Sequence, residues 1–525
     1  INLRTQHPKT AKQIEKSYSI HPVSARVLAA RDFKADEMLE VFLNPTLGKG
    51  LPPDTQLYGL QAGCELVEQI ASDKQTVAIC CDFDVDGLSG GSLLSSFLRD
   101  AGIENTVYVP DRFKDGYGLN AAMVQQAKAD GHSLLICVDY GTTNHKELTL
   151  AREIGLRSIV IDHHHVGDHV VPADVFINPQ QKNCKFADGI LCAAGLVWYF
   201  TIGLKKYCKQ ASKLDPRRYL DLACLGTICD MVPLQGVNRV IAKRGLEMLS
   251  QTSRVGLQAL KNVCGINQEV TGGHVGFGIG PRINAAGRML DGNLVIELLT
   301  TSDSLRAKKI ADRLNRLNLE RQDTEAIIKD AAHEQVQSLS GLPYGIVCHG
   351  DDFHTGVIGI VAQRMVESYY RPTAVLGQEN GIYKGSVRGI KDFSVVEALT
   401  DLGDILLKFG GHAGAGGFSI APENLATFKQ RFNETCMKRL EKVSLEPLST
   451  ADTTASLAEI DIRLVEDFKN FAPFGIGNAA PQLLVEDLKV QSVQVLKNAH
   501  LKVQFSDGKV SMPALMWRTT THPAL

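Results

Sequence analysis

Long apolar runs are missing from this sequence of 525 residues. No run approaches the roughly 20 apolar residues that a membrane-spanning helix needs. The polar residues 1–16 also contain no apolar core of the kind that secretory signals have. We therefore expect a cytoplasmic protein that does not contact membranes.

Cys-x-x-Cys pairs are also missing, although the chain contains 12 cysteines. Several of them, such as Cys80, Cys137, Cys224 and Cys229, stand inside apolar runs. This placement is typical of buried, reduced thiols and argues against disulfides or a zinc site.

The net charge is close to zero, at −2, with 22% charged residues. This balance argues against a protein that coats nucleic acid indiscriminately. It does not exclude nucleic-acid binding, because the positive charge of a basic groove and the negative charge of an acidic metal site cancel in the net charge. No exposed heptad seam stands out either, and we expect a monomer.

Three carboxylates follow one short apolar stretch. Residues 77–80 favour a buried strand, and Asp82, Asp84 and Asp86 come directly after it, before a helical pattern that starts at Leu93. Carboxylates this close repel one another unless a cation lies between them, which indicates a divalent metal site. The alternatives are a solvated acidic turn or a Ca²⁺ loop, but an EF-hand needs Glu at its twelfth position, which is Leu93 here.

Two further predicted strands end in side chains that bind metals. Residues 133–138 are followed by Asp139, and residues 158–161 are followed by Asp-His-His at 162–164. Helical patterns separate these strands, which predicts a doubly wound, mostly parallel α/β sheet. Ligands bind such sheets outside the carboxyl ends of the strands, so we expect these side chains to meet there. Asp230, at the end of an apolar helix, is a weaker candidate on its own.

The chain is too long for one hydrophobic core, and about 150 residues per domain predicts three to four domains. The first α/β lobe is expected to continue through a long amphipathic helix into a second α/β lobe, and the last segment is strand-rich. The expected segments are an N-terminal helical cap (1–55), the first lobe (56–291), the connecting helix (292–340), the second lobe (341–445) and a C-terminal β domain (446–525).

Nine motifs together resemble the DHH phosphoesterases and, within them, the RecJ-type single-strand exonucleases. They occur over nearly the whole chain in the expected order, and departures such as Tyr140, His165, Gly414 and Gly416 remove no ligand. The motifs are 82–87 (DFDVDG), 138–142 (VDYGT), 162–164 (DHH), 230–234 (DMVPL), 280–288 (GPRINAAGR), 354–360 (HTGVIGI), 384–388 (KGSVR), 410–413 (GGHA) and 473–478 (PFGIGN).

The resemblance implies a two-metal centre for phosphodiester hydrolysis, in which two ions about 3.5 to 4 Å apart supply a nucleophilic water and neutralise phosphoryl charge. One ion is assigned to Asp82 and Asp84, the other to Asp86, His163 and Asp230, with Asp139 as the bridge. Mixed imidazole and carboxylate ligation suits Mn²⁺, with Mg²⁺ as the alternative. Asp162 is expected to orient a neighbouring histidine and His164 to contact the scissile phosphate.

The resemblance also implies single-stranded DNA with a 5′ phosphate as the substrate and 5′ to 3′ release of mononucleotides, in DNA repair and recombination. A helicase and a single-strand DNA-binding protein are the expected partners, and the C-terminal domain is expected to be an OB-like barrel. The implied substrate residues are Arg112, Ser386 and Arg388 for the 5′ phosphate, Tyr117 for base stacking, Asn284, Arg282 and Arg288 for the DNA backbone or scissile group, and His412 for the second-lobe side of the cleft.

Two other functions stay open at this point. One is a DHH phosphodiesterase for short oligoribonucleotides, cyclic dinucleotides or pyrophosphate, although its typical two-lobe chain needs no N-terminal cap or C-terminal β domain. The other is an inactive scaffold like the DHH-like components of replicative helicase assemblies. That function requires loss of metal ligands, and all six expected ligands are present.

Overall fold

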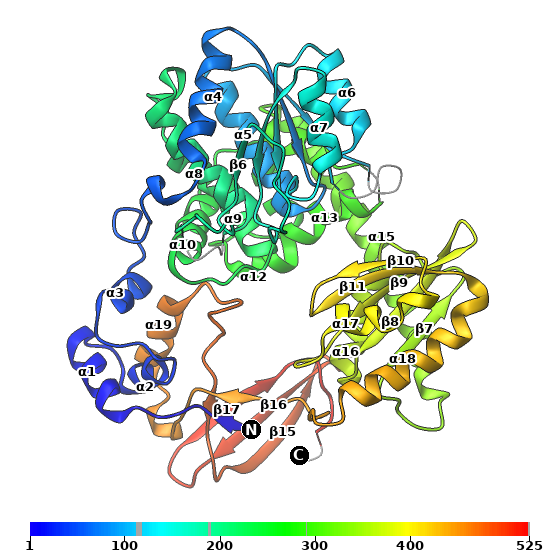
Figure 1. Ribbon diagram of the computed structural model, residues 1–525. Helices are drawn as coiled ribbons and strands as arrows, with labels where there is room; N and C mark the ends of the chain where they lie inside the picture. Colours follow the sequence, from blue (N-terminus) through cyan, green and yellow to red (C-terminus); the bar gives the residue numbers. More distant parts are fainter. Residues whose placement is uncertain (112–117, 187–190, 290, 523–525) are drawn as a thin grey trace.

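The computed structural model describes residues 1–111, 118–186, 191–289 and 291–522. Two five-stranded sheets form the centres of two α/β lobes, and a smaller antiparallel sheet lies near the C-terminus (Figure 1). Among the helices of the described residues, none is both long enough and apolar enough to cross a membrane.

The first sheet is parallel throughout, as predicted. Its register aligns the strand ends, because Val138 pairs with both Cys81 and Ile161. The residues that follow these three positions therefore begin side by side at one edge. In spatial order the strands are β3 (Asn105–Tyr108), β2 (Val77–Cys81), β4 (Leu134–Val138), β5 (Arg157–Ile161) and β6 (Val175–Ile177).

Helices cover both faces of this sheet, which explains why β2 and β4 are apolar at every position. One face packs Ala78 and Cys80 against α6 (Ala121–Ala129) and α7 (His145–Glu153). The other packs Val77, Ile79 and Cys81 against α4 (Leu60–Ser72), α5 (Val85–Asp100) and α8 (Ala193–Tyr207).

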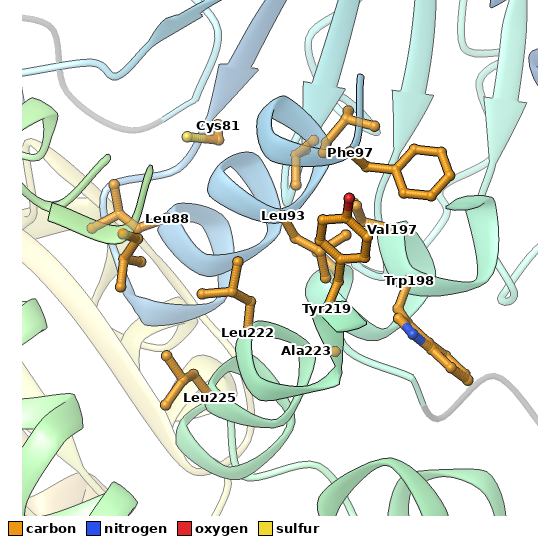
Figure 2. Close-up of a cluster of buried hydrophobic side chains, with 14 of the residues drawn as sticks. Cys81, Leu88, Leu93, Phe97, Val197, Trp198, Tyr219, Leu222, Ala223 and Leu225 are labelled. Atoms are coloured by element: carbon orange, nitrogen blue, oxygen red, sulfur yellow. The ribbon is translucent and has the colours of Figure 1, made fainter. Parts of the chain in front are cut away.

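Helix α5 is the centre of the largest apolar cluster. Figure 2 shows Leu88, Leu93 and Phe97 of α5 in the cluster that also contains Val197 of α8 and Leu222 of α9 (Leu220–Cys229). Almost every residue of α5 is buried, including the Ser and Gly residues at 89–92. Small side chains there let α8 and α9 approach closely, and the first turn of α5, which carries the acidic motif, is fixed by this packing.

A helical region completes the first lobe and leads to the second (Figure 1). The expected connecting helix is divided in two, because the chain leaves helical geometry after Thr300 and Asp303 caps a new helix by accepting from the amides of Leu305 and Arg306. The helices are α10 (Gly236–Ser250), α11 (Val255–Val263), α12 (Gly272–His274), a π-helical turn (Val275–Ile279), α13 (Gly280–Met289), α14 (Asn293–Thr300) and α15 (Ser304–Gln337).

The second lobe has a mixed sheet in which β7 and β8 are parallel and the other pairs antiparallel. The strands in spatial order are β10 (Lys408–Gly411), β11 (Ala415–Ile420), β9 (Ile382–Arg388), β8 (Thr373–Glu379) and β7 (Ile346–Gly350). The helices are α16 (Ile358–Tyr369), α17 (Val395–Thr400) and α18 (Leu425–Arg439).

The N-terminal cap shares its hydrophobic core with residues near the other end of the chain. Ile14, Leu28 and Phe42 pack with Phe471 in one cluster, and β1 (Asn2–Leu3) pairs in parallel with β12 (Thr450–Ala451). The cap helices are α1 (Pro8–Tyr18), α2 (Pro22–Ala30) and α3 (Glu37–Leu43), and they pack near α19 (Ile462–Phe471).

The last strands form a three-stranded antiparallel sheet in the order β15-β16-β17. A short parallel pair, β13 (Thr453–Thr454) with β14 (Leu483–Leu484), precedes it. The three strands are β15 (Lys489–Leu496), β16 (His500–Ser506) and β17 (Ser511–Met516).

Arg239 of α10 joins the cap, the first lobe and the C-terminal region. Its side chain is only 1% exposed, and its guanidinium donates to the carbonyls of Phe42 at 2.8 Å, Phe471 at 2.9 Å and Asn470 at 3.1 Å. It also lies over the ring of Phe42, and burial lowers its pKa to about 10. One buried cation thus satisfies carbonyls from two distant segments.

Candidate metal centre

The structure brings the six expected metal ligands together at the carboxyl edge of the parallel sheet. In each of three groups, one ligand atom of every member lies within 4.8 Å of the others. The three groups are Asp82, Asp84 and Asp139; Asp86, His163 and Asp230; and Asp139, His163 and His164.

The first turn of α5 positions two of the carboxylates. Asp84 caps the helix, its Oδ1 accepting from the amides of Asp86 at 2.9 Å and Gly87 at 3.1 Å. Asp86 is 1% exposed, and its two oxygens accept from the amides of Ala193 at 2.7 Å and Ala194 at 2.9 Å, at the N-terminus of α8. Hydrogen bonds from a helix N-terminus stabilise a carboxylate, so Asp86 is held in one orientation.

Gly226 of α9 leaves the space that Asp86 needs. A Cβ at this position would lie 2.2 Å from Asp86 Oδ1, closer than any real contact. The helix that ends at Asp230 therefore passes directly beside Asp86, and this close approach brings Asp230 Oδ2 to 3.7 Å from His163 Nε2.

Asp139 follows β4 in the left-handed region, with φ of 69°. Such a backbone conformation is unfavourable for a residue with a side chain and is found at functional sites. It directs the buried carboxylate toward His163, whose Nε2 lies 3.3 Å from Asp139 Oδ1. Asp139 belongs to both the Asp82 group and one His163 group, as a bridging ligand must.

Asp162 orients His164 and the backbone around it. Its Oδ1 accepts from Nδ1 of His164 at 2.7 Å and from the amide of His163 at 2.7 Å, while Oδ2 accepts from the amide of Thr142 at 3.0 Å. Although burial opposes it, the hydrogen bond from His164 holds the pKa of Asp162 well below its usual range. The same bond raises the pKa of His164 to about 9.

Two residues that the sequence reasoning missed support this segment. Asn178 is fully buried, and its Nδ2 donates to the carbonyl of His164 at 2.9 Å and to Oγ1 of Thr142 at 3.2 Å. Thr142 lies within the motif at 138–142, so its place next to the strand end was visible in the sequence. Asn178 follows β6 and carried no comparable signal.

The electrostatics of the cluster favour a bound cation. Burial and the nearby carboxylates of Asp86 and Asp84 raise the pKa of Asp230 to about 8. Burial, followed by repulsion from Asp86, also raises the pKa of Asp84 and of Asp139. Oxygen donors with one imidazole are a donor set for hard or borderline divalent metals, so the residues present fit a divalent metal site.

Helix α13 carries the next set of expected residues. Oδ1 of Asn284 accepts from the amide of Val85 at 3.2 Å, which places it against the acidic turn. Arg282 is instead bound to Oδ1 of Asn315 at 3.0 Å and to the carbonyl of Gly278 at 2.8 Å. The side chain of Arg288 lies outside the described residues, as do Arg112 and Tyr117.

A separate cavity of about 430 Å³ lies in the second lobe, and Ser386 and Arg388 line it. Arg388 donates to Oγ of Ser386 at 2.9 Å, and burial lowers its pKa. Gly359, in the first turn of α16, also lines the cavity, and a Cβ there would lie 2.9 Å from Nη2 of Arg388. His412 is exposed and is not among the lining residues.

Comparison with family models divides the chain into three matched parts. Residues 76–227 match the DHH family, N-terminal domain, and residues 341–438 match the DHHA1 domain. Residues 451–524 match the RecJ OB domain, which identifies the C-terminal antiparallel sheet as part of an OB domain, as predicted.

Curated relatives match almost the whole chain. A single-stranded-DNA-specific exonuclease RecJ from Bacillus subtilis is 32% identical over 94% of this chain, which spans 62% of that relative's length. The protein of the same name from Haemophilus influenzae is 33% identical over 89% of this chain and 84% of its own length.

A solved structure agrees with the fold. The crystal structure of RecJ from Thermus thermophilus in complex with Mn²⁺ superimposes with a TM-score of 0.84 and 27% identity, over 99% of this chain and 74% of that chain. The parallel first lobe, the second α/β lobe and the OB domain are thus those of a known architecture. This chain belongs to the RecJ family of DHH proteins.

Proposed function

We propose that this protein is a single-stranded-DNA-specific 5′ to 3′ exonuclease that releases 5′ mononucleotides by two-metal hydrolysis, in DNA repair and recombination. The observation that carries the proposal is the meeting of Asp82, Asp84 and Asp139 with Asp86, His163 and Asp230 at one sheet edge. Its family relatives are named single-stranded-DNA-specific exonucleases. A short-oligonucleotide phosphodiesterase is not favoured, because these relatives match through the OB domain.

The proposed ligand division is the one that the family resemblance implies, and the three groups of side chains support it. Asp82 and Asp84 would hold one ion, Asp86, His163 and Asp230 would hold the other, and Asp139 would be shared. When bound, Mn²⁺ or Mg²⁺ supplies an activated water and neutralises charge on the phosphoryl oxygens. The amides of Ala193 and Ala194 keep Asp86 in place, so that the ligand set is preorganised.

His164 is proposed to contact the scissile phosphate as a cation. In the protein without bound metal, the hydrogen bond with Asp162 raises the pKa of His164 to about 9, which keeps the imidazole protonated at neutral pH. Its side chain is 47% exposed, so Nε2 is accessible to substrate while Nδ1 is bound to Asp162. A positioned donor of this kind stabilises charge that develops on a phosphoryl oxygen.

The second-lobe cavity is proposed to hold the terminal 5′ phosphate. Arg388 and Ser386 line it, and the first turn of α16 adds amides and the positive end of the helix dipole. An anchored 5′ end places the following linkage over the metal ions, which gives the direction of hydrolysis. Arg112 and Tyr117 stay proposals for phosphate contact and base stacking.

A second cavity, of about 730 Å³, is proposed to lie on the path of the DNA strand. It is lined by residues of the first lobe, α15, α16 and the C-terminal domain. Phe277 lines it with 87% of its surface exposed, and Lys329, Arg364 and Arg518 are also in the lining. Aromatic faces and cations together bind single strands without sequence preference. Asn284 is also in the lining. Arg282 stays a proposal for contact with the DNA backbone.

The test uses single-stranded DNA labelled separately at each end, with Mn²⁺ present. Labelled mononucleotide should appear first from the 5′ end, and chelation of the metal should abolish its release. Duplex DNA and dinucleotides should be poor substrates. Release from the 3′ end first, or faster hydrolysis of a dinucleotide, contradicts the proposal.

The phosphate anchor has its own test. Arg388→Ala should erase the preference for 5′-phosphate over 5′-hydroxyl ends, and Gly359→Ala should reduce it because the added Cβ displaces the guanidinium. Arg431→Ala, which removes an exposed arginine paired with Asp404, is the matched control. An unchanged preference in both variants removes this cavity from the proposal.

Four finer features complete the proposal: a helicase and a single-strand DNA-binding protein as partners, a monomeric state, a cytoplasmic location, and Mn²⁺ as the preferred ion. His412 stays a proposal for the second-lobe side of the cleft, outside the cavity that Arg388 lines. Metal preference is tested by comparing binding of Mn²⁺ and Mg²⁺ at equal concentrations.

A further inference from the structure

The proposed function assigns no role to the motif at 473–478. It lies in the C-terminal region between α19 and β14 and forms a tight turn. The amide of Gly475 donates to the carbonyl of Asn478 at 2.9 Å, and the amide of Asn478 donates back to Gly475 at 3.1 Å. A turn closed in both directions presents its middle residues, Ile476 and Gly477, outward as a rigid unit.

This turn contacts the segment that follows the metal-site residue Asp230. The amide of Leu234 donates to the carbonyl of Ile476 at 2.7 Å. Nε2 of Gln235 donates to the carbonyl of Gly477 at 2.8 Å. Leu234 is 3% exposed, so its buried amide depends on this partner from a distant part of the chain.

Glycine is favoured at 477 by the backbone conformation and at 475 by a close contact. Gly477 has φ of +72°, and a Cβ there would lie 3.1 Å from Cβ of Pro233. A Cβ at Gly475 would lie 2.9 Å from Cδ1 of Leu234. The backbone of the turn thus packs closely on the side chains of Pro233 and Leu234, and a side chain at either glycine would disturb this contact.

At its start the segment is held by Val232, which is 8% exposed and packs with Cys192 and Ala194. Asp230 caps the end of α9, and Met231 has φ of 60° with a side chain 63% exposed. Asn238 donates to the carbonyl of Pro233 at 3.0 Å from α10. The short link between α9 and α10 therefore leaves helical geometry directly after a metal-site residue, and the turn fixes its far end.

The turn itself is held firmly in the C-terminal region and the cap. Nδ2 of Asn478 donates to the carbonyls of Phe471 at 2.8 Å and Pro473 at 2.9 Å. Arg31 of the cap donates to Oδ1 of Asn478 at 3.4 Å and forms a two-fold ion pair with Asp452. These contacts fix the turn relative to the cap and the OB domain, and the turn in turn fixes the segment beside the metal centre.

We propose that the turn at 475–478 is a positioning element of the metal centre, which holds residues 231–235 so that the carboxylate of Asp230 stays beside Asp86 and His163. The inference rests on the proposed metal site, and it gives the C-terminal region a part in metal binding besides DNA binding. Residues that support metal ligands typically change metal affinity by 10- to 100-fold when altered.

The test is a titration of the metal-free full chain with Mn²⁺. Electron paramagnetic resonance measures the free ion at each step. Gly477→Ala should weaken one of the bound ions by about tenfold. Gln235→Ala, which removes one hydrogen bond from the other side of the contact, should weaken the same ion by less. Gly508→Ala is the matched control, since Gly508 has φ of +88° in the same region with open space around it.

A double-mutant cycle separates positioning from general damage. If the turn acts through Asp230, Gly477→Ala should have no further effect on Mn²⁺ affinity in an Asp230→Asn background. Additive losses, or equal losses for Gly477→Ala and Gly508→Ala, overturn the proposal. If Gly477→Ala does not fold, Gln235→Ala tests the proposal instead. In that case, an Mn²⁺ affinity of Gln235→Ala equal to that of the parent contradicts the proposal.

Failure of the proposed function gives a different result. If the cluster binds no Mn²⁺, the unaltered protein and every variant show no bound ion. If the cluster binds Mn²⁺ but the turn has no part in it, all variants except Asp230→Asn bind like the parent. Saturating Mn²⁺ should also restore nuclease turnover in Gly477→Ala, because the ligands themselves are intact.

Discussion

Nδ1 of His164 lies 2.7 Å from Oδ1 of Asp162, and this hydrogen bond shifts the pKa of both groups in opposite directions. It raises the pKa of His164 to about 9 and holds that of Asp162 below its usual range. The pair is therefore ionic at neutral pH, close to where a phosphate is proposed to bind.

The first prediction concerns this pair. In the metal-free protein, the imidazole resonance of His164 should titrate near pH 9, and Asp162→Asn should lower the midpoint toward the ordinary value of about 6.5. Because the folded pKa of His164 is raised and that of Asp162 is lowered, the pair stabilises the fold fully between about pH 4 and 6.5, and the stabilisation is lost as pH rises through 9. His164→Gln identifies the resonance, and a midpoint near 6.5 in the parent contradicts the prediction.

Asp139→Asn tests the bridging position. Asn tolerates the left-handed backbone at this residue, so the variant should fold. Turnover should fall by roughly 100-fold or more, because one metal-bridging charge is lost. The metal-free variant should unfold at a temperature no lower than the parent at pH 8, since a buried, repelled carboxylate has been removed. Near-parental turnover with Mn²⁺ would show that Asp139 is not a ligand.

Metal binding should release protons. Asp230, with its pKa raised to about 8, holds a proton at pH 7 in the metal-free protein, and a divalent ion displaces it. Calorimetry of Mn²⁺ binding in buffers of different ionisation enthalpy should detect this release at pH 7 and less of it above pH 8. Since the folded state binds this proton more tightly than the unfolded state, stability of the metal-free protein should fall as pH rises from about 4 to 8. Asp230→Asn should reduce both effects.

Arg239→Met should destabilise the protein through the three carbonyls that lose their donor. Each buried unsatisfied group costs about 1 to 3 kcal/mol, so the total loss should be about 3 kcal/mol or more. The first transition in urea should move to lower concentration, and the cap should become sensitive to protease. Arg217→Met is the control, because that side chain is 67% exposed and paired only locally. Equal midpoints for the two variants contradict the prediction.

The sequence was sufficient to predict where the first lobe places its acidic groups. Asp82, Asp139 and Asp162 each follow a continuous apolar run, and parallel strands of similar length must end at one edge. Both α/β lobes were predictable because periodicity and turn residues are local signals. The OB domain was predictable only through the family resemblance, since the pattern itself indicated no more than a strand-rich segment.

The sequence contains no local pattern that predicts contacts between distant segments. Nothing near Asp86 indicates that the amides of Ala193 and Ala194 bind its carboxylate, or that Gly226 gives it space. The division of the connecting helix at Thr301 depends on a cap that the amphipathic pattern hides. The hydrogen bond from Arg282 to Asn315 depends on how α13 packs against α15.

The pairing of β1 with β12 has a consequence for biosynthesis. Leu3 finds its partner Ala451 only after 448 further residues have been made. At about 5 to 20 residues per second, the start of the chain waits roughly 20 to 90 seconds on the ribosome before its strand can form. The first lobe can fold in that time, whereas the cap core waits for Phe471. An exposed apolar surface around Ile14 and Leu28 is therefore a part of the nascent protein that chaperones have reason to cover.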